Sequence, residues 1–116
     1  MASSKEYLQF ILEQLSGLEE INYRAMMGEY IIYYRGRIAG GIYDDRLLVK
    51  PTKSAVSYMT TAIYEISYKG AKEMLLVEDV DSKEYLAGLF NAMYDELPVH
   101  KANNKKKSLN NLYTFQ

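Results

Sequence analysis

Few side chains in this chain of 116 residues are of the types that perform catalysis or bind metals. The sequence contains no cysteine and a single histidine, His100, which excludes cysteine nucleophiles, zinc ribbons and iron–sulfur ligation. A serine–histidine–aspartate triad would have to use His100, and no Gly-x-Ser-x-Gly turn accompanies it. We therefore predict a non-enzymatic protein with no cofactor and no metal, in which His100 is a solvated residue.

Two basic residues, Arg24 and Lys50, fall near the ends of expected strands. Both side chains could bind an anion or an acidic surface of a partner protein. The alternative is a structural role, in which they pair with Asp44, Asp45 or Glu29 at the edge of the sheet.

Tyrosine is unusually abundant, with twelve residues. Tyr30, Tyr33, Tyr34 and Tyr43 lie on neighbouring expected strands, and no predicted element covers the second face of that sheet. Exposed tyrosines suit a protein interface because they combine a large contact area with a polar tip at low entropic cost. We predict that this face binds a protein partner or a second copy of the chain; the alternative is that these tyrosines are half-buried and pack in the core and at the edge of the sheet.

The glycines at 36, 40 and 41 do not form a phosphate-binding loop, because their spacing fits neither known pattern and no helix follows them. Gly36 is expected to supply a positive φ in a turn, and Gly40-Gly41 to mark a bulge or the close approach of a helix. The acidic cluster at 78–84 lacks the order of a calcium-binding loop and fits the entry of a helix.

The first expected helix covers Ser4–Ser16, with Ser3 and Glu6 spaced as a capping box and leucines at three- and four-residue steps. A meander of three or four antiparallel strands follows over 21–50, with two-residue turns at Arg35-Gly36 and Asp44-Asp45.

A short helix is then expected over Thr52–Thr61, with Val56 and Met59 as its apolar contacts. Two further strands are expected within 62–78, and a last helix opens at Asp81 or Ser82 and closes at Pro98. The resulting order, α-β-β-β-α-β-β-α, predicts a two-layer α+β domain with helices packed on one face of an antiparallel sheet.

The charge changes along the chain, which predicts a folded domain over residues 1–98 and a basic C-terminal extension over 99–116. Residues 1–100 carry 10 basic and 15 acidic side chains (−5), whereas the segment from Lys101 onward adds four lysines (+4). Lys105, Lys106 and Lys107 are candidates for weak, salt-sensitive binding to nucleic acid. The start of the sequence has no signal-peptide pattern and no segment is apolar enough for a membrane span, so a cytoplasmic location is expected.

Several ordered motifs resemble the N-terminal domain of the TfoX (Sxy) competence regulators: Tyr23–Tyr30 (YRAMMGEY), Tyr34–Arg37 (YRGR), Gly41–Leu47 (GIYDDRL) and Val49-Lys50. Arg24 and Lys50 match basic positions of that pattern. Lys72–Val77 and Glu96–Pro98 fit its short, stand-alone members, so the resemblance spans about residues 1–98. It implies a fold like that of secretion chaperones and a link to transcriptional control of DNA uptake. We expect the lysine-rich extension to stand in place of the helical second domain of the full-length regulators.

Overall fold

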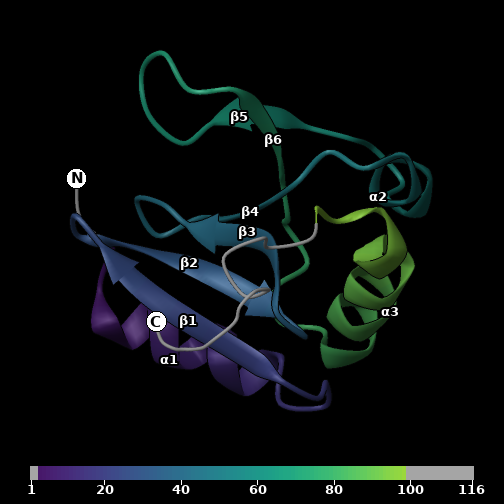
Figure 1. Cartoon of the computed structure of the whole chain (residues 1–116), viewed down its shortest axis with the longest axis horizontal. Coiled ribbons are helices and arrows are strands. Elements are labelled where there is room, and N and C mark those ends of the chain that lie inside the picture. Colours follow the sequence, from purple (N-terminus) through teal and green to yellow (C-terminus); the bar gives the residue numbers. More distant parts are fainter. Residues whose placement is uncertain (1–2, 99–116) are drawn as a thin grey trace, which may run out of the picture.

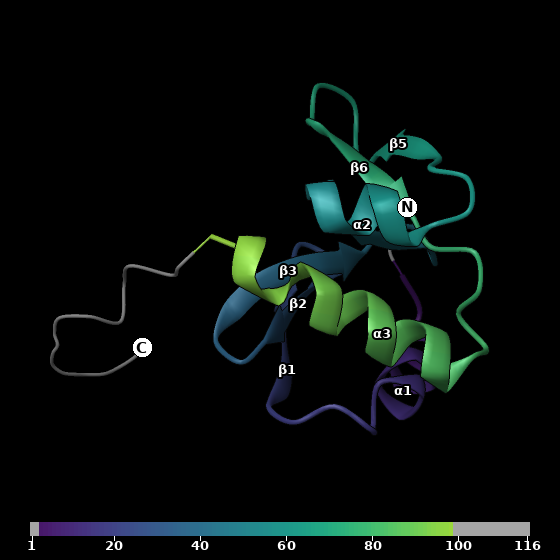
Figure 2. The same ribbon diagram turned by 90° about the vertical axis from the view of Figure 1, so that its right-hand side faces the viewer.

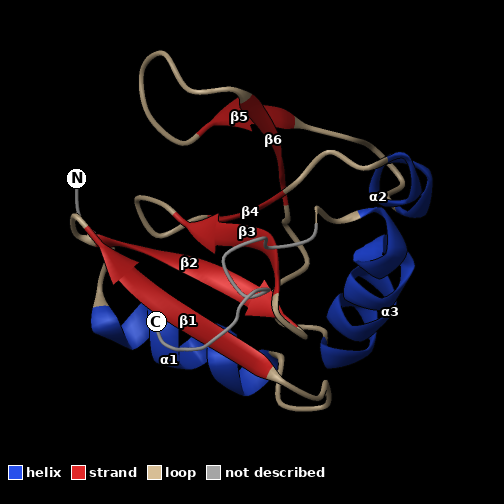
Figure 3. Cartoon of the chain, in the orientation of Figure 1, coloured by secondary structure: helices blue, strands red, loops and turns tan. Residues whose placement is uncertain are grey.

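The protein has two layers, a six-stranded antiparallel sheet and three helices (Figures 1 and 3), in a computed structural model that describes residues 3–98. The strands are ordered β1-β2-β3-β4-β6-β5 across the sheet. The elements follow one another as α1 (Lys5–Gln14), β1 (Ile21–Met26), β2 (Glu29–Tyr34), β3 (Arg37–Ile42), β4 (Leu47–Val49), α2 (Lys53–Tyr58), β5 (Tyr64–Ile66), β6 (Glu73–Leu76), α3 (Lys83–Met93) and a final turn of 3-10 helix, Tyr94–Glu96. The predicted α+β class is confirmed, and the meander has four strands, the larger of the two expected numbers.

Three tight turns build this meander. Met27-Gly28, Arg35-Gly36 and Asp44-Asp45 each have two central residues with φ between 51° and 84°. Two consecutive positive φ values define the turn whose twist matches that of antiparallel strands. The expected positive φ of Gly36 is confirmed, and Met27-Gly28 adds a hairpin between β1 and β2 that the sequence analysis did not separate.

Gly40 is where β3 passes closest to its neighbour β4. The pairing between β2 and β3 shifts register between Ile32 and Tyr33, which is a bulge next to Gly40. A Cβ atom on Gly40 would lie 2.1 Å from the Leu48 carbonyl oxygen and 2.7 Å from the Cα atom of Val49. The expected bulge at this glycine pair is therefore confirmed. The close approach is to the backbone of strand β4 and not to a helix, which was the other expectation.

The start of α1 differs by one residue from the predicted capping box. The Ser4 hydroxyl accepts the hydrogen bond from the Tyr7 backbone N–H at 3.1 Å, so Ser4 is the N-cap. Ser3 is buried and its hydroxyl donates to the Glu29 carboxylate at 2.6 Å. Both serines could cap a helix locally, and the tertiary contact with Glu29 decides which one does.

All three helices contribute to one apolar core on a single face of the sheet. Figure 2 shows α2 stacked on α3, and Ala55 and Met59 of this region are buried in the core. Val56 is 36% exposed, so its predicted core role is wrong and Ala55, one position earlier on the helix, takes that place. On α3, the Ser82 hydroxyl accepts from the Tyr85 backbone N–H at 3.2 Å, which makes Ser82 rather than Asp81 the cap. The fully buried core side chains include Ile11, Leu15, Ile32, Ile42, Leu47, Leu75, Leu86, Leu89, Phe90 and Met93.

Candidate functional site

Tyr30 and Tyr34 of β2 do not lie on the exposed face that the sequence predicted, whereas half-buried Tyr33 is on the opposite side of the strand. Tyr34 is only 3% exposed; its hydroxyl donates to Asn91 Oδ1 at 2.7 Å, and its ring meets those of Phe90 and Tyr94 edge-on. Tyr30 is half-buried and packs against the same core. Because side chains alternate along a strand, Tyr30, Ile32 and Tyr34 all face the helices. Tyr34 is therefore a core residue, and its assignment to an exposed interface is wrong.

The open face of the sheet carries a different apolar surface, which we call the methionine–tyrosine groove. It is a groove of about 420 Å³ lined by Met26, Met27, Glu29, Ile31, Tyr43, Ser67 and Tyr68. One wall is the tip of the β1–β2 hairpin and the other is the loop between β5 and β6, both at the left of Figure 1. Met27 is 97% exposed and Tyr68 is 68% exposed. Of the predicted tyrosines, Tyr43 lines this groove.

A network of hydrogen bonds fixes the hairpin turns beside the groove. Glu29 Oε1 accepts from the Ser3 hydroxyl at 2.6 Å and from the Asp44 backbone N–H at 3.2 Å. The Ser3 backbone N–H donates to the Gly28 carbonyl at 3.0 Å, and Asp45 Oδ1 accepts from the Ser4 N–H at 2.9 Å. The N-terminal residues thereby join the β1–β2 turn to the β3–β4 turn, and the groove is preorganised.

Tyr43 supplies the groove with a hydroxyl that stays protonated. Burial raises the pKa of Tyr43 above its ordinary value, and the nearby Tyr68 and Glu29 raise it further. The neutral phenol can donate one hydrogen bond to a ligand while its ring adds apolar area. With Glu29 already accepting from Ser3 and Asp44, the groove combines an apolar lining with few polar groups, as peptide- and ligand-binding surfaces do.

The two predicted basic residues, Arg24 and Lys50, are not brought together. Arg24 is exposed on β1, whereas half-buried Lys50 follows β4, and β2 and β3 lie between them. Within residues 3–98 the ion pairs are Arg46–Glu65 and Lys83–Glu13, so the alternative pairing of Arg24 or Lys50 with nearby acids is not observed there. The structure thus places no two-residue anion site at these positions.

Two arginines that the sequence analysis did not single out hold the end of α3. The guanidinium carbons of Arg35 and Arg37 lie 4.7 and 4.4 Å from the centre of the Tyr94 ring. Arg37 Nη1 also donates to the Tyr94 carbonyl at 3.0 Å. A cation at the C-terminal end of a helix satisfies free carbonyls and opposes the helix dipole. In the sequence, the Arg-Gly-Arg spacing across a predicted hairpin turn was the signal that could have indicated these two arginines.

Comparison with known proteins identifies the family. The sequence matches the family model described as the TfoX N-terminal domain over residues 13–88, more than half of the chain. The chain belongs to the TfoX N-terminal domain family. The resemblance seen in the sequence is confirmed, and the matched span contains all six strands and every residue of the methionine–tyrosine groove.

Another relative of this TfoX N-terminal domain is the "Uncharacterized 12.7 kDa protein in trpE 5'region" of Spirochaeta aurantia. It is 29% identical over 80 residues, which cover 69% of this chain and 70% of the relative. No solved structure matches the chain.

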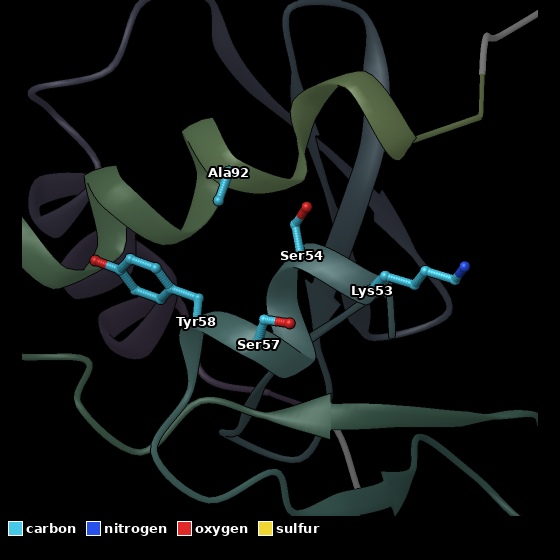
Figure 4. Close-up of a pocket in the computed structure, with 5 residues that line it drawn as sticks. All are labelled: Lys53, Ser54, Ser57, Tyr58 and Ala92. Atoms are coloured by element: carbon cyan, nitrogen blue, oxygen red, sulfur yellow. The ribbon is translucent and has the colours of Figure 1, made fainter.

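A shallower pocket of about 370 Å³ lies between α2 and α3 of the TfoX N-terminal domain, lined by Lys53, Ser54, Ser57, Tyr58 and Ala92 (Figure 4). The Lys53 side chain points away from Ala92, so it does not place a positive charge over the pocket. The Tyr58 hydroxyl donates to the Tyr85 carbonyl at 3.1 Å, which ties α2 to α3. These contacts indicate helix packing rather than ligand binding.

The carboxyl group of Glu96, which bonds to Ser54 of this pocket, has a lowered pKa. Hydrogen bonds from the Ser54 hydroxyl and backbone N–H lower the pKa of the Glu96 carboxyl. A lowered pKa stabilises the fold above the ordinary carboxyl pKa, and this contribution is lost as the pH falls through the lowered value.

We expect Ser54→Ala to raise the pKa of Glu96 toward its ordinary value, because the largest cause of the shift is the Ser54 hydroxyl. Carboxyl chemical shifts followed by NMR from neutral to acidic pH measure this change. Ser57→Ala, on the same helix, is the control and should leave the titration of Glu96 where it is. An unchanged midpoint in Ser54→Ala would contradict the assigned hydrogen bond.

The predictions about metal binding, membrane spans and nucleic-acid binding can be compared with the structure over residues 3–98. In that part of the chain no group of three or more His, Asp or Glu side chains could hold a metal ion. No helix within the described range is long and apolar enough to cross a membrane. His100 and the three candidate lysines, Lys105, Lys106 and Lys107, lie outside the described residues, so nucleic-acid binding through the basic extension stays a prediction.

Proposed function

We propose that this TfoX N-terminal domain is a non-enzymatic interaction module that acts in transcriptional regulation by binding an apolar segment of a partner protein in the methionine–tyrosine groove. The regulatory part of the proposal rests on family membership. The binding part rests on one observation: two large side chains, Met27 and Tyr68, are largely exposed on the opposite walls of one groove.

The chemistry of the lining favours a protein partner. Methionine side chains are flexible and polarizable, and they adapt to apolar partners of different shapes. Tyrosine is among the residues that carry most of the binding energy at interfaces. Contiguous apolar surface that is exposed on a folded protein marks an interaction site. The hydrogen-bond network of Glu29 keeps one wall in place before binding, which lowers the entropic cost of association.

A photo-crosslinking residue at position 27 of the full chain, introduced in the source cells, should capture a defined partner. We then expect Tyr68→Ala to weaken binding of that purified partner about tenfold or more, a loss typical of a central aromatic contact. Isothermal titration calorimetry measures the Kd. Transcript levels that respond to the wild-type chain but not to Tyr68→Ala would support the regulatory role.

Tyr64→Ala provides the matched control, because Tyr64 on β5 is also exposed (47%) and does not line the groove. It should leave the Kd unchanged. Equal effects of the two substitutions, or no effect of either, would overturn the assignment of the groove.

A further inference from the structure

Strand β1 forms one edge of the sheet and lacks the features that usually protect an edge. Five of its six residues are exposed, its pairing with β2 runs without a register shift, and it contains no proline. Arg24 is its only charged side chain. Natural edges are commonly short, bulged, or guarded by charges and proline, because an open edge pairs with other strands. The opposite edge, β5, is only three residues long.

The hairpin geometry determines which backbone groups of β1 point outward. In a two-residue hairpin such as that at Met27-Gly28, the flanking residues Met26 and Glu29 exchange both of their N–H···O bonds. Hydrogen-bonded positions alternate along the strand, so the N–H and C=O groups of Ile21, Tyr23 and Ala25 point away from β2. Among the described residues no other element bonds to these groups.

We infer that β1 pairs antiparallel with β1 of a second copy of this chain, about a two-fold axis at Tyr23, which joins the two sheets into one. This register is self-complementary. Tyr23 faces Tyr23 of the second copy, and Ile21 faces Ala25 of the second copy, so every outward backbone group finds a partner. The interface lies at the sheet edge, apart from the methionine–tyrosine groove, and goes beyond the proposed function.

The side chains fit the same register. On the open face Arg24 stands opposite Asn22 of the second copy, so the guanidinium can donate to the amide oxygen and the two Arg24 charges are kept apart. On the helix face, the edge of β1 borders a hollow of about 430 Å³ that includes the apolar side chains Leu12, Leu15 and Leu18 beside Tyr23. The two-fold axis places both α1 helices on this face, where the second copy can fill the hollow.

The absence of cysteine from the sequence allows a direct test. Hydrogen-bonded residues directly opposed in an antiparallel pair, as Tyr23 and its copy would be, have Cα atoms about 5.5 Å apart, which is within the range of a disulfide. We expect the full chain with Tyr23→Cys to form a covalent dimer under mild oxidation, seen on a non-reducing gel. Met27→Cys, at the exposed turn away from the axis, is the control and should stay largely monomeric. Equal cross-linking of the two variants would overturn the register.

Sedimentation of the full chain supplies the second measurement. The wild-type chain should be a dimer, and Ala25→Pro should be a monomer with an unchanged far-UV circular dichroism spectrum, because the lost N–H points away from β2. Ala25→Thr keeps that N–H and should remain dimeric. A wild-type chain that is monomeric up to its solubility limit, or a dimer that survives Ala25→Pro, would overturn the inference. Both readouts are independent of any partner bound in the groove.

Discussion

Gly40→Ala is expected to lower the free energy of unfolding by about 3 kcal/mol, the upper range for forcing an extra atom into a packed interior. The added Cβ would lie 2.1 Å from the Leu48 carbonyl oxygen and 2.7 Å from the Cα atom of Val49. Both are backbone atoms of β4, which cannot rotate aside as a side chain can. Relief therefore requires β3 and β4 to separate, and β4 is fully buried between β3 and β6.

Gly17→Ala is the matched control for Gly40→Ala. A Cβ on Gly17 would meet nothing within 4 Å, and Gly17 is not among the glycines with positive φ. Its unfolding free energy should change by no more than about 1 kcal/mol, with stabilisation as the expected sign, because alanine reduces the entropy of the unfolded chain. Urea denaturation followed by circular dichroism measures both variants. Equal stability of the two would show that β3 and β4 are not as close as described.

Tyr34→Ala is expected to cost about 4 kcal/mol of unfolding free energy, as other buried aromatic truncations do. The substitution empties the space beside Phe90 and Tyr94 and leaves Asn91 Oδ1 without the tyrosine hydroxyl that donates to it. Tyr34→Phe keeps the ring and removes only the hydroxyl, so it should cost about 1–2 kcal/mol. Denaturant unfolding of the three chains separates the packing contribution from the hydrogen bond.

Tyr68→Ala serves as the comparison for Tyr34→Ala. Its side chain is 68% exposed, so the unfolding free energy should change by less than about 0.5 kcal/mol, while partner binding weakens about tenfold or more. The two substitutions should therefore separate stability from binding. A stable Tyr34→Ala protein that loses its partner would instead restore the interface role that the sequence alone assigned to Tyr34.

The assignment of Tyr34 could not be made from the sequence because β2 is apolar on both of its faces. Its residues, EYIIYY, place Tyr30, Ile32 and Tyr34 on one side and Ile31 and Tyr33 on the other. In a strand where apolar and polar residues alternate, the apolar residues indicate the buried side; β2 has no such alternation. The helices decide the matter, because Phe90 and Tyr94 come to the Tyr34 side from residues far along the chain.

The methionine–tyrosine groove could not be predicted from the sequence for a related reason. Met27 was visible in the sequence as part of Met-Met-Gly, and Tyr68 as part of a turn before Gly70. They line one groove because β4 pairs with β6, which brings the β5–β6 hairpin over the open face beside the β1–β2 tip. Such pairing between distant strands depends on the burial of the whole sheet and leaves no local signal.

Features that depend on neighbouring residues could be predicted from the amino-acid sequence alone. These are the two-residue turns at Arg35-Gly36 and Asp44-Asp45, the amphipathic helices, the α+β class and the family pattern. Turn chemistry and hydrophobic period are local, so they can be read without knowing the fold. Three other features follow from tertiary contacts: the face of β2 that the helices cover, the choice of Ser4 over Ser3 as the cap of α1, and the open edge at β1. Each of these depends on contacts between segments distant in sequence, where burial and backbone pairing outweigh local preference.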